Sequence, residues 1–172
     1  MESLKEVAMR IKDIALIGIM SAILVVVQVA LRFLPNIELV SLLIIIYTLV
    51  FGRKAFYIIY AFVAVEGLLY GIGLWWINYL YVWTLLCLLV LLLHKQRSPF
   101  VWAILSGFYG LAFGALCAFP NLFLSGIGSA VSYWIAGIPY DVLHGVGNFV
   151  VALLLFHPLY YVMNKVNRRA AY

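Results

Sequence analysis

Three polar residues near the C-terminal end have a spacing that suits ligand binding or acid–base chemistry. Asp141, His144 and Asn148 stand at positions i, i+3 and i+7, which places them on one face of a helix. Together they could bind a polar solute, or Asp141 and His144 could exchange a proton as an acid–base pair. The alternative is structural: a helix cap followed by a histidine and an asparagine that hydrogen-bond to neighbouring helices.

Glu66 and a group of aromatic residues extend this set. Glu66 is the one acidic residue in a long apolar stretch, where an ionisable group is costly. Trp76, Tyr79 and Trp83 repeat the i, i+3, i+7 spacing further along the chain. Their rings could stack on a flat solute or pack in the core. Carboxylates, an amide, an imidazole and aromatic faces together predict a site for a small, flat, polar solute.

Motifs for other kinds of chemistry are missing from the sequence. There is no GxxxxGK[ST] motif, and the glycine pairs do not form a dinucleotide fingerprint. There is also no GxSxG motif of a serine hydrolase. Cys87 and Cys117 lie in apolar stretches, without the spacing of a zinc site or a disulfide framework. We therefore expect neither a metal site nor a cofactor.

The composition predicts an integral membrane protein. Of the 172 residues, 67% are hydrophobic and 10% are charged, against about 45–50% and about 25% in soluble domains. The mean hydropathy is +1.14. At about 20 residues per crossing, the chain has room for about six helices and no soluble domain. An ATPase, kinase or nucleic-acid module would have to be on another chain.

Charges, glycines and prolines divide the chain into predicted helices. The sequence lacks the alternation of apolar and polar residues that is typical of β-strands. Helices are then the structure that satisfies the hydrogen bonds of a backbone that faces lipid. The charged start of the chain does not have the pattern of a removable signal peptide. We expect one all-α membrane domain, a bundle of six transmembrane helices over residues 14–33, 36–52, 55–71, 75–93, 100–118 and 140–163. Residues 119–138 are expected to form an external or re-entrant segment, because prolines and glycines interrupt them.

The basic residues set the predicted topology, because cytoplasmic loops collect Lys and Arg. With six crossings, both termini are cytoplasmic and ten of the eleven basic residues lie on that side. Arg32 alone faces out. Seven crossings would put the basic C-terminal cluster outside, so the sequence favours six.

The acidic residues of the apolar part map to the other side of the membrane. Glu38, Glu66 and Asp141 fall at the outer ends of predicted helices, with His144 and Asn148 within two turns of Asp141. Such groups usually face the bundle interior or a wet cavity. The sequence therefore predicts a pocket that opens to the outside.

The first predicted helix carries a stripe of small residues. Ala15, Gly18 and Ala22 share one face, and small residues let another helix approach closely. The spacing alone favours a neighbour within the bundle over a separate protein.

Taken together, these features resemble the S components of energy-coupling factor (ECF) transporters, which are their substrate-binding membrane subunits. The likeness covers nearly the whole chain and includes its size, its basic loops and the small-residue stripe. The short segments that carry it are Pro35 to Glu38, Glu66 with Gly67, Trp75 to Tyr79, and Gly137 to Asp141 with His144 and Asn148.

The resemblance implies a substrate-capture subunit of an ECF-type ABC importer in a prokaryotic plasma membrane, with no enzymatic activity of its own. Such a subunit binds a vitamin or related micronutrient from outside and docks on a transmembrane T component that carries two cytoplasmic ATPases. It also implies docking through Ala15, Gly18 and Ala22, which reverses the preference for an internal contact. The alternatives are a small membrane enzyme that uses Asp141 and His144, and a stand-alone secondary carrier.

The resemblance further implies that the loop between the first two helices acts as a lid over a pocket built from later helices and outer loops. The lid residues would be Arg32, Pro35, Asn36 and Glu38. The substrate-binding residues would be Glu66, Tyr70, Trp76, Asn78, Tyr79, Trp83, Tyr140, Asp141, His144 and Asn148.

Charge narrows the expected substrate. Three carboxylates and one arginine on the outer side favour a cationic or amine-bearing heteroaromatic over a dianion such as folate. A thiamine-related aminopyrimidine, a pyridoxine-type vitamer or a deazaguanine base belongs to this class.

Overall fold

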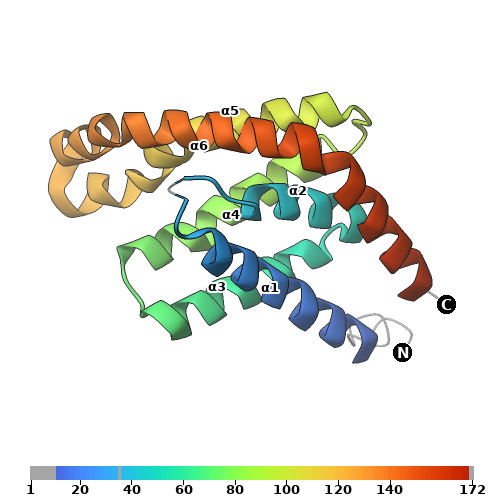
Figure 1. The fold of residues 1–172 in the computed structure, drawn as a ribbon. Coiled ribbons are helices and arrows are strands. Elements are labelled where there is room, and N and C mark those ends of the chain that lie inside the picture. The colour runs from blue at the N-terminus through green and yellow to red at the C-terminus, as the bar shows by residue number, and fades with distance from the viewer. Residues whose placement is uncertain (1–10, 35, 171–172) are drawn as a thin grey trace.

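Residues 11–34 and 36–170 are described by a computed structural model, and Pro35 of the expected lid lies outside this part of the chain. The described residues form six helices and no strand, which confirms the all-helical prediction (Figure 1). The helices are α1 (Ile11–Leu31), α2 (Val40–Phe51), α3 (Lys54–Tyr70), α4 (Leu74–Leu92), α5 (Pro99–Cys117) and α6 (Phe119–Ala170).

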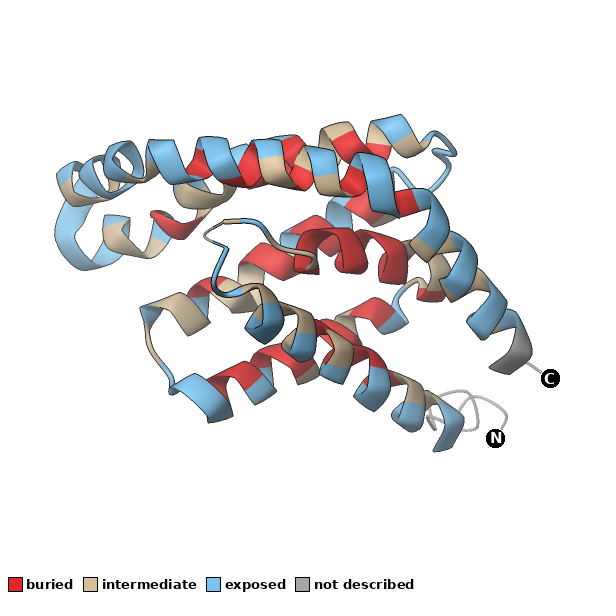
Figure 2. Ribbon diagram, in the orientation of Figure 1, coloured by how far each residue is buried: buried red, intermediate tan, exposed pale blue. Residues whose placement is uncertain are grey.

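Helix α2 is the centre of the bundle. It contacts each of the other five helices, and ten of its 12 residues are buried (Figure 2). A helix that is apolar on every side is buried, either in a protein core or in a membrane, and the Leu-Ile run of α2 has this pattern. Because α2 is fixed on all sides, the residues at its beginning form a rigid base for the loop that precedes it.

Four of the described helices are long and apolar enough to cross a membrane, namely α1, α4, α5 and α6. Helix α3 has 17 residues and α2 has 12. At 1.5 Å per residue, α2 is about 18 Å long, which is shorter than a hydrocarbon core of about 30 Å. The helix lengths support a membrane-embedded protein, in which α2 is enclosed by its neighbours.

Helix α6 differs from the expected last helix. We expected the helix to begin at Tyr140, because Gly137 and Pro139 usually interrupt helices. Instead, residues 119–170 are helical apart from Gly126, where φ is +82° and the backbone turns sharply. The predicted boundary is wrong because the apolar chain on both sides of Pro139 satisfies its backbone polar groups best by remaining helical. The first part of α6 is largely exposed and projects beyond α1–α4 (Figure 2).

The alternating helices place two sets of loops at opposite ends of the molecule. The described start of α1 and the end of α6 lie at the same end, together with the α2–α3 turn and the α4–α5 loop (Figure 1). At this end, Lys54 Nζ pairs with Asp13 Oδ1 at 2.7 Å and joins α3 to α1. Arg32, after α1, lies at the opposite end. The fold therefore gathers the described basic residues, other than Arg32, at one end of the bundle.

Helices α5 and α6 pack backbone against backbone. A Cβ atom added to Gly110 would lie 2.8 Å from the carbonyl carbon and oxygen of His144, and one on Gly145 would lie 3.0 Å from the Gly107 oxygen. Small residues allow this close approach of two helices. The contact fixes the position of the α6 face that carries Asp141, His144 and Asn148.

Candidate functional site

A small cavity lies at the end of the bundle that carries Arg32. Its volume is about 260 Å³, and it lies between the end of α1, the end of α3 and the beginning of α4. The residues that line it are Gln28, Val29, Arg32, Glu66, Tyr70, Trp75 and Tyr79. The cavity combines one carboxylate, one guanidinium, one amide and three aromatic rings, a composition that suits a small polar ring compound.

Glu66 is the most constrained polar group of this cavity. Its side chain is 1% exposed, and its Oε2 accepts a hydrogen bond from Gln28 Nε2 at 3.2 Å. Gln28 Nε2 also donates to the hydroxyl of Tyr79 at 3.1 Å. The second oxygen, Oε1, has no hydrogen-bond partner among the described residues. A buried carboxylate oxygen without a partner is costly, so this atom is an open acceptor for a donor group of a ligand.

The predicted lid is attached to the bundle through Glu38. Its Oε2 accepts a hydrogen bond from the Ser41 backbone N–H in the first turn of α2 at 2.9 Å, and its Oε1 lies 3.4 Å from His144 Nε2. Burial alone would raise the pKa of Glu38, but the contacts with His144 and Ser41 outweigh it and lower the pKa below its usual 4.5. Asn36 in the same loop has φ +58°. Glu38 thus connects the loop, α2 and α6.

The other polar residues of α6 have separate partners. Asn148 Nδ2 donates to Ser41 Oγ at 3.3 Å, and Asp141 Oδ1 accepts from the Gly114 backbone N–H at 2.9 Å. Asn148 Oδ1 and Asp141 Oδ2 are without a hydrogen-bond partner in the described part of the chain. Within that part, Asp141 and His144 do not hydrogen-bond to each other. Each is positioned by another helix or loop.

An aromatic row connects the Glu66 cavity with the Glu38–His144 contact. Ring centroids are 5.4 Å apart for Trp75 and Tyr79 and 5.4 Å apart for Tyr79 and Trp83. The row continues through Phe113, 5.6 Å from Trp83 and 4.9 Å from the His144 ring. The expected residues therefore form two polar groups joined by rings rather than one pocket.

Three of the expected binding residues have other surroundings. Trp76 donates its indole N–H to the Val63 carbonyl at 2.8 Å and packs over Gly67. Asn78 lies beside the end of α5, where it donates to the Cys117 carbonyl at 3.4 Å and accepts from the Tyr81 hydroxyl at 2.9 Å. Tyr140 is 59% exposed and lies outside the Glu66 cavity. Glu66, Tyr70 and Tyr79 are the expected binding residues that share that cavity.

The sequence reasoning missed Gln28, Val29 and Trp75 as lining residues. Gln28 was recognisable, because it is the one amide in the uncharged run from Ile14 to Leu31 and such a group needs a partner in an apolar environment. Val29 and Trp75 give no such signal, since apolar and aromatic residues are common at the ends of membrane helices.

The small-residue stripe of α1 faces outward. Ala15, Gly18 and Ala22 are exposed, and a Cβ atom added to Gly18 would have no atom of the described residues within 4 Å. Helix α1 instead contacts α3 through another face, where Ser21 Oγ donates to the Ile58 carbonyl at 2.9 Å. The stripe does not carry the internal contact that its spacing alone favoured.

The described residues contain no group of three or more His, Cys, Asp or Glu side chains arranged to hold a metal ion. Comparison of the chain with protein-family models, curated proteins and solved structures gives no significant match.

Proposed function

We propose that this chain is the substrate-capture subunit of an ECF-type ABC importer and that it binds a small amine-bearing heteroaromatic compound in the Glu66 cavity. The observation that carries the proposal is Oε1 of Glu66, a buried carboxylate oxygen that has no hydrogen-bond partner among the described residues and belongs to a residue that lines the cavity. A protonated ring nitrogen or an amino group of the substrate would complete this hydrogen bond, and charge assistance makes such a bond strong.

The walls of the cavity favour a flat ring. Trp75 and Tyr79 lie edge to face, with their centroids 5.4 Å apart, and Tyr70 lines the same space. Aromatic faces bind ring compounds through large contact areas. The volume of about 260 Å³ is below the usual range of ligand pockets, about 300–1,000 Å³, so it favours a vitamin-sized ring over an extended molecule.

The cavity lies where a substrate could enter from the outside. Arg32 belongs to both the cavity lining and the predicted lid, and Glu38 connects that lid to α2 and α6. The described basic residues other than Arg32 gather at the far end, the pattern that marks a cytoplasmic side. Movement of the loop would open or close the cavity on the outer face.

Energy for uptake would come from other chains. The sequence has no nucleotide-phosphate motif, and we propose that a transmembrane T component and two cytoplasmic ATPases supply it. The exposed stripe of Ala15, Gly18 and Ala22 supports a docking face on α1, because small residues allow close helix contact.

Binding titrations of the purified full chain test this proposal. Trp75 and Trp83 lie in the aromatic row beside the cavity, so their fluorescence should report binding. Thiamine and a deazaguanine base are the amine-bearing probes, pyridoxine is a probe with a protonatable ring nitrogen, and folate is the dicarboxylate. We expect saturable binding of one of the first three probes and none of folate. Preference for folate would contradict the charge argument.

A further inference from the structure

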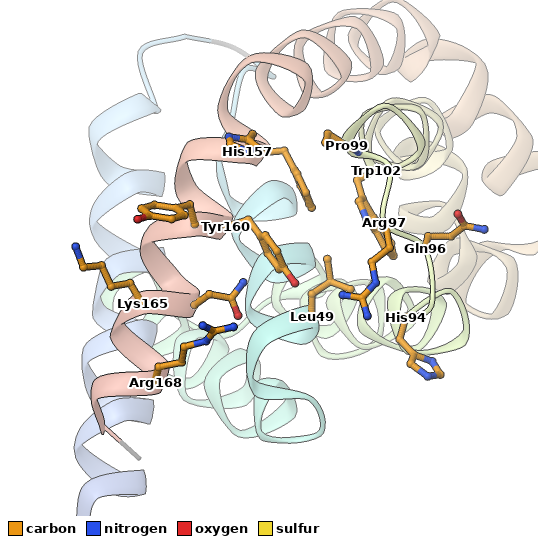
Figure 3. A pocket seen from close by; sticks show the side chains of 13 residues that line it. Leu49, His94, Gln96, Arg97, Pro99, Trp102, His157, Tyr160, Lys165 and Arg168 are labelled. Atoms are coloured by element: carbon orange, nitrogen blue, oxygen red, sulfur yellow. The ribbon is translucent and has the colours of Figure 1, made fainter. Parts of the chain in front are cut away.

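A second and larger cavity lies at the other end of the bundle, near the end of α6. Its volume is about 790 Å³. It is lined by the end of α2, by the α4–α5 loop with the beginning of α5, and by the last turns of α6 (Figure 3). None of the residues that line it belongs to the Glu66 cavity, and the proposed capture function does not use it.

The lining of this cavity is basic. Arg97, Lys165 and Arg168 line it together with two histidines, and none of the described Asp or Glu residues does. Figure 3 shows that Arg97 and Arg168 extend from α4–α5 and from α6 towards the same space, whereas Lys165 points away. Neither arginine forms an ion pair within the described residues. Two unpaired guanidinium groups that face one space are suited to a phosphate, which each can bind through two parallel hydrogen bonds.

An aromatic stack forms one wall of the cavity. Trp102 of α5 lies parallel to Phe156 of α6, with centroids 6.3 Å apart, and Phe156 lies parallel to Tyr160 at 5.5 Å. Tyr160 directs its hydroxyl towards the space between the arginines (Figure 3). The wall thus offers an apolar surface with one hydroxyl donor beside two cationic groups.

We propose that this cavity binds the phosphodiester headgroup of an anionic membrane lipid. Helices α5 and α6 are both long and apolar enough to span a membrane, and the cavity lies between the ends that face the basic side. Tyr161, an exposed residue of α6 that lines the cavity, would contact the lipid at the membrane interface. Basic pockets between membrane helices on this side recognise anionic headgroups. A free phosphate ion would fill only a small part of about 790 Å³.

Native mass spectrometry of the detergent-purified full chain tests this site. The protein is titrated with phosphatidylglycerol and, separately, with phosphatidylcholine of the same acyl chains. We expect phosphatidylglycerol to be retained about tenfold more strongly, because its net negative charge is not offset by a headgroup cation. Equal retention of the two lipids would overturn the proposal. Displacement of phosphatidylglycerol by millimolar inorganic phosphate would assign the site to soluble phosphate anions instead.

Two matched double variants test whether the lipid preference depends on the arginines of this cavity. Arg97→Gln with Arg168→Gln removes the two guanidinium charges that extend towards the cavity, and Arg53→Gln with Lys95→Gln removes two exposed charges at the same end that do not line the cavity. We expect the first pair to lose the lipid preference and the second to keep it. An equal loss of the phosphatidylglycerol preference in both double variants would show a general attraction of the lipid to basic surface residues and would overturn the proposed site. Arg97→Lys keeps the charge but loses the planar guanidinium group, so it should weaken retention partially.

Discussion

At the residue scale, Glu66 combines two properties that rarely occur together in a structural residue. Its carboxylate is buried and lines a cavity, and one of its oxygens has no partner in the described chain. Gln28 donates to Oε2 of this carboxylate and also to the Tyr79 hydroxyl, and these contacts orient the group. Oε1 is the carboxylate oxygen that remains to accept a hydrogen bond from a ligand.

Replacement of Glu66 by Gln should weaken the binding of an amine-bearing substrate about tenfold or more. The amide can still accept the hydrogen bond of Gln28, so the fold should persist, but the charge-assisted bond to the substrate is lost, and such bonds contribute about 1.5–3 kcal/mol. Isothermal titration of the purified variant measures the loss. Tyr140→Phe alters an exposed residue away from the cavity and should bind normally. An unchanged affinity of the Glu66→Gln variant would show that this carboxylate does not contact the substrate.

The pairing of Glu38 with His144 and Ser41 should make stability depend on pH. The folded pKa of Glu38 lies below 4.5, because these contacts outweigh burial, which alone would raise it. A carboxyl group whose pKa is lower in the folded state than in the unfolded state stabilises the fold. This stabilisation is fully present at pH values above the unfolded-state pKa and is lost as the pH falls through the folded-state pKa. Glu38→Gln should therefore lower the Tm near neutral pH.

The difference in Tm between the original chain and Glu38→Gln should shrink as the pH falls below 4.5 and through the lowered pKa of Glu38, because the carboxyl group then becomes protonated. Thermal unfolding in detergent across this range measures it. A difference that stays constant from neutral to acidic pH would show that the charge of Glu38 contributes nothing to the contact.

Single residues also show where sequence reasoning succeeds and where it stops. Glu66, His144 and Asn148 could be predicted as inward-facing, because a polar group in an apolar helix must avoid lipid. Their division between two polar groups could not be predicted, because it depends on which helices are neighbours. In the sequence, Asn78 is a polar residue in an apolar helix, as a ligand-binding residue would be. In the structure its side-chain amide instead donates a hydrogen bond to the carbonyl group of Cys117 at the end of α5.

At the scale of elements, the contact between α5 and α6 determines where Asp141 and His144 lie. Gly107, Gly110 and Gly114 form the face of α5 that meets α6, and Asp141 rests against Gly114. A side chain at these glycines would separate the two helices. The polar face of α6 therefore depends on glycines of another helix.

Gly110→Leu should destabilise the protein strongly, because even a Cβ atom there would lie 2.8 Å from the His144 backbone. Overpacking of a core contact costs about 1–3 kcal/mol or more. Thermal unfolding compares this variant with Gly128→Leu, a change at an exposed helical glycine whose Cβ would have no atom within 4 Å. Equal Tm values for the two variants would contradict the close packing of α5 and α6.

Helix α6 shows that proline residues in the sequence do not always mark the end of a helix. Proline inside a helix removes one hydrogen bond and bends the axis, yet α6 continues through Pro139 and Pro158. The positions of α1 to α5 were predictable from their apolar runs and the charges between them. The path of residues 119–138 was not, because the competing alternatives all satisfy the backbone and differ only in tertiary packing.

At the scale of the whole molecule, the two ends of the bundle carry cavities with different side chains. One end carries the Glu66 cavity and Arg32, and the other carries the remaining described basic residues and the larger basic cavity. Between them lies the apolar core around α2. This polarity is what a capture subunit needs if substrate binds on one side and the energy-supplying partners act from the other.

Gly18→Leu should separate binding from assembly. Gly18 is exposed on α1, and in the described part of the chain no atom lies within 4 Å of its Cβ position, so a larger side chain should leave the fold and substrate affinity unchanged. It should prevent co-purification of the T component, since bulk on a small-residue face keeps a partner helix at a distance. Gly128→Leu is the matched control, and normal assembly of Gly18→Leu would place the docking face elsewhere.

Native mass spectrometry of the gently extracted full chain, expressed in rich medium, decides whether the chain captures a substrate for an importer. We expect one bound heteroaromatic molecule per chain, absent from Glu66→Gln, together with co-purifying T-component and ATPase chains. A chain that is empty after extraction and stays empty after exposure to a panel of vitamins would contradict it.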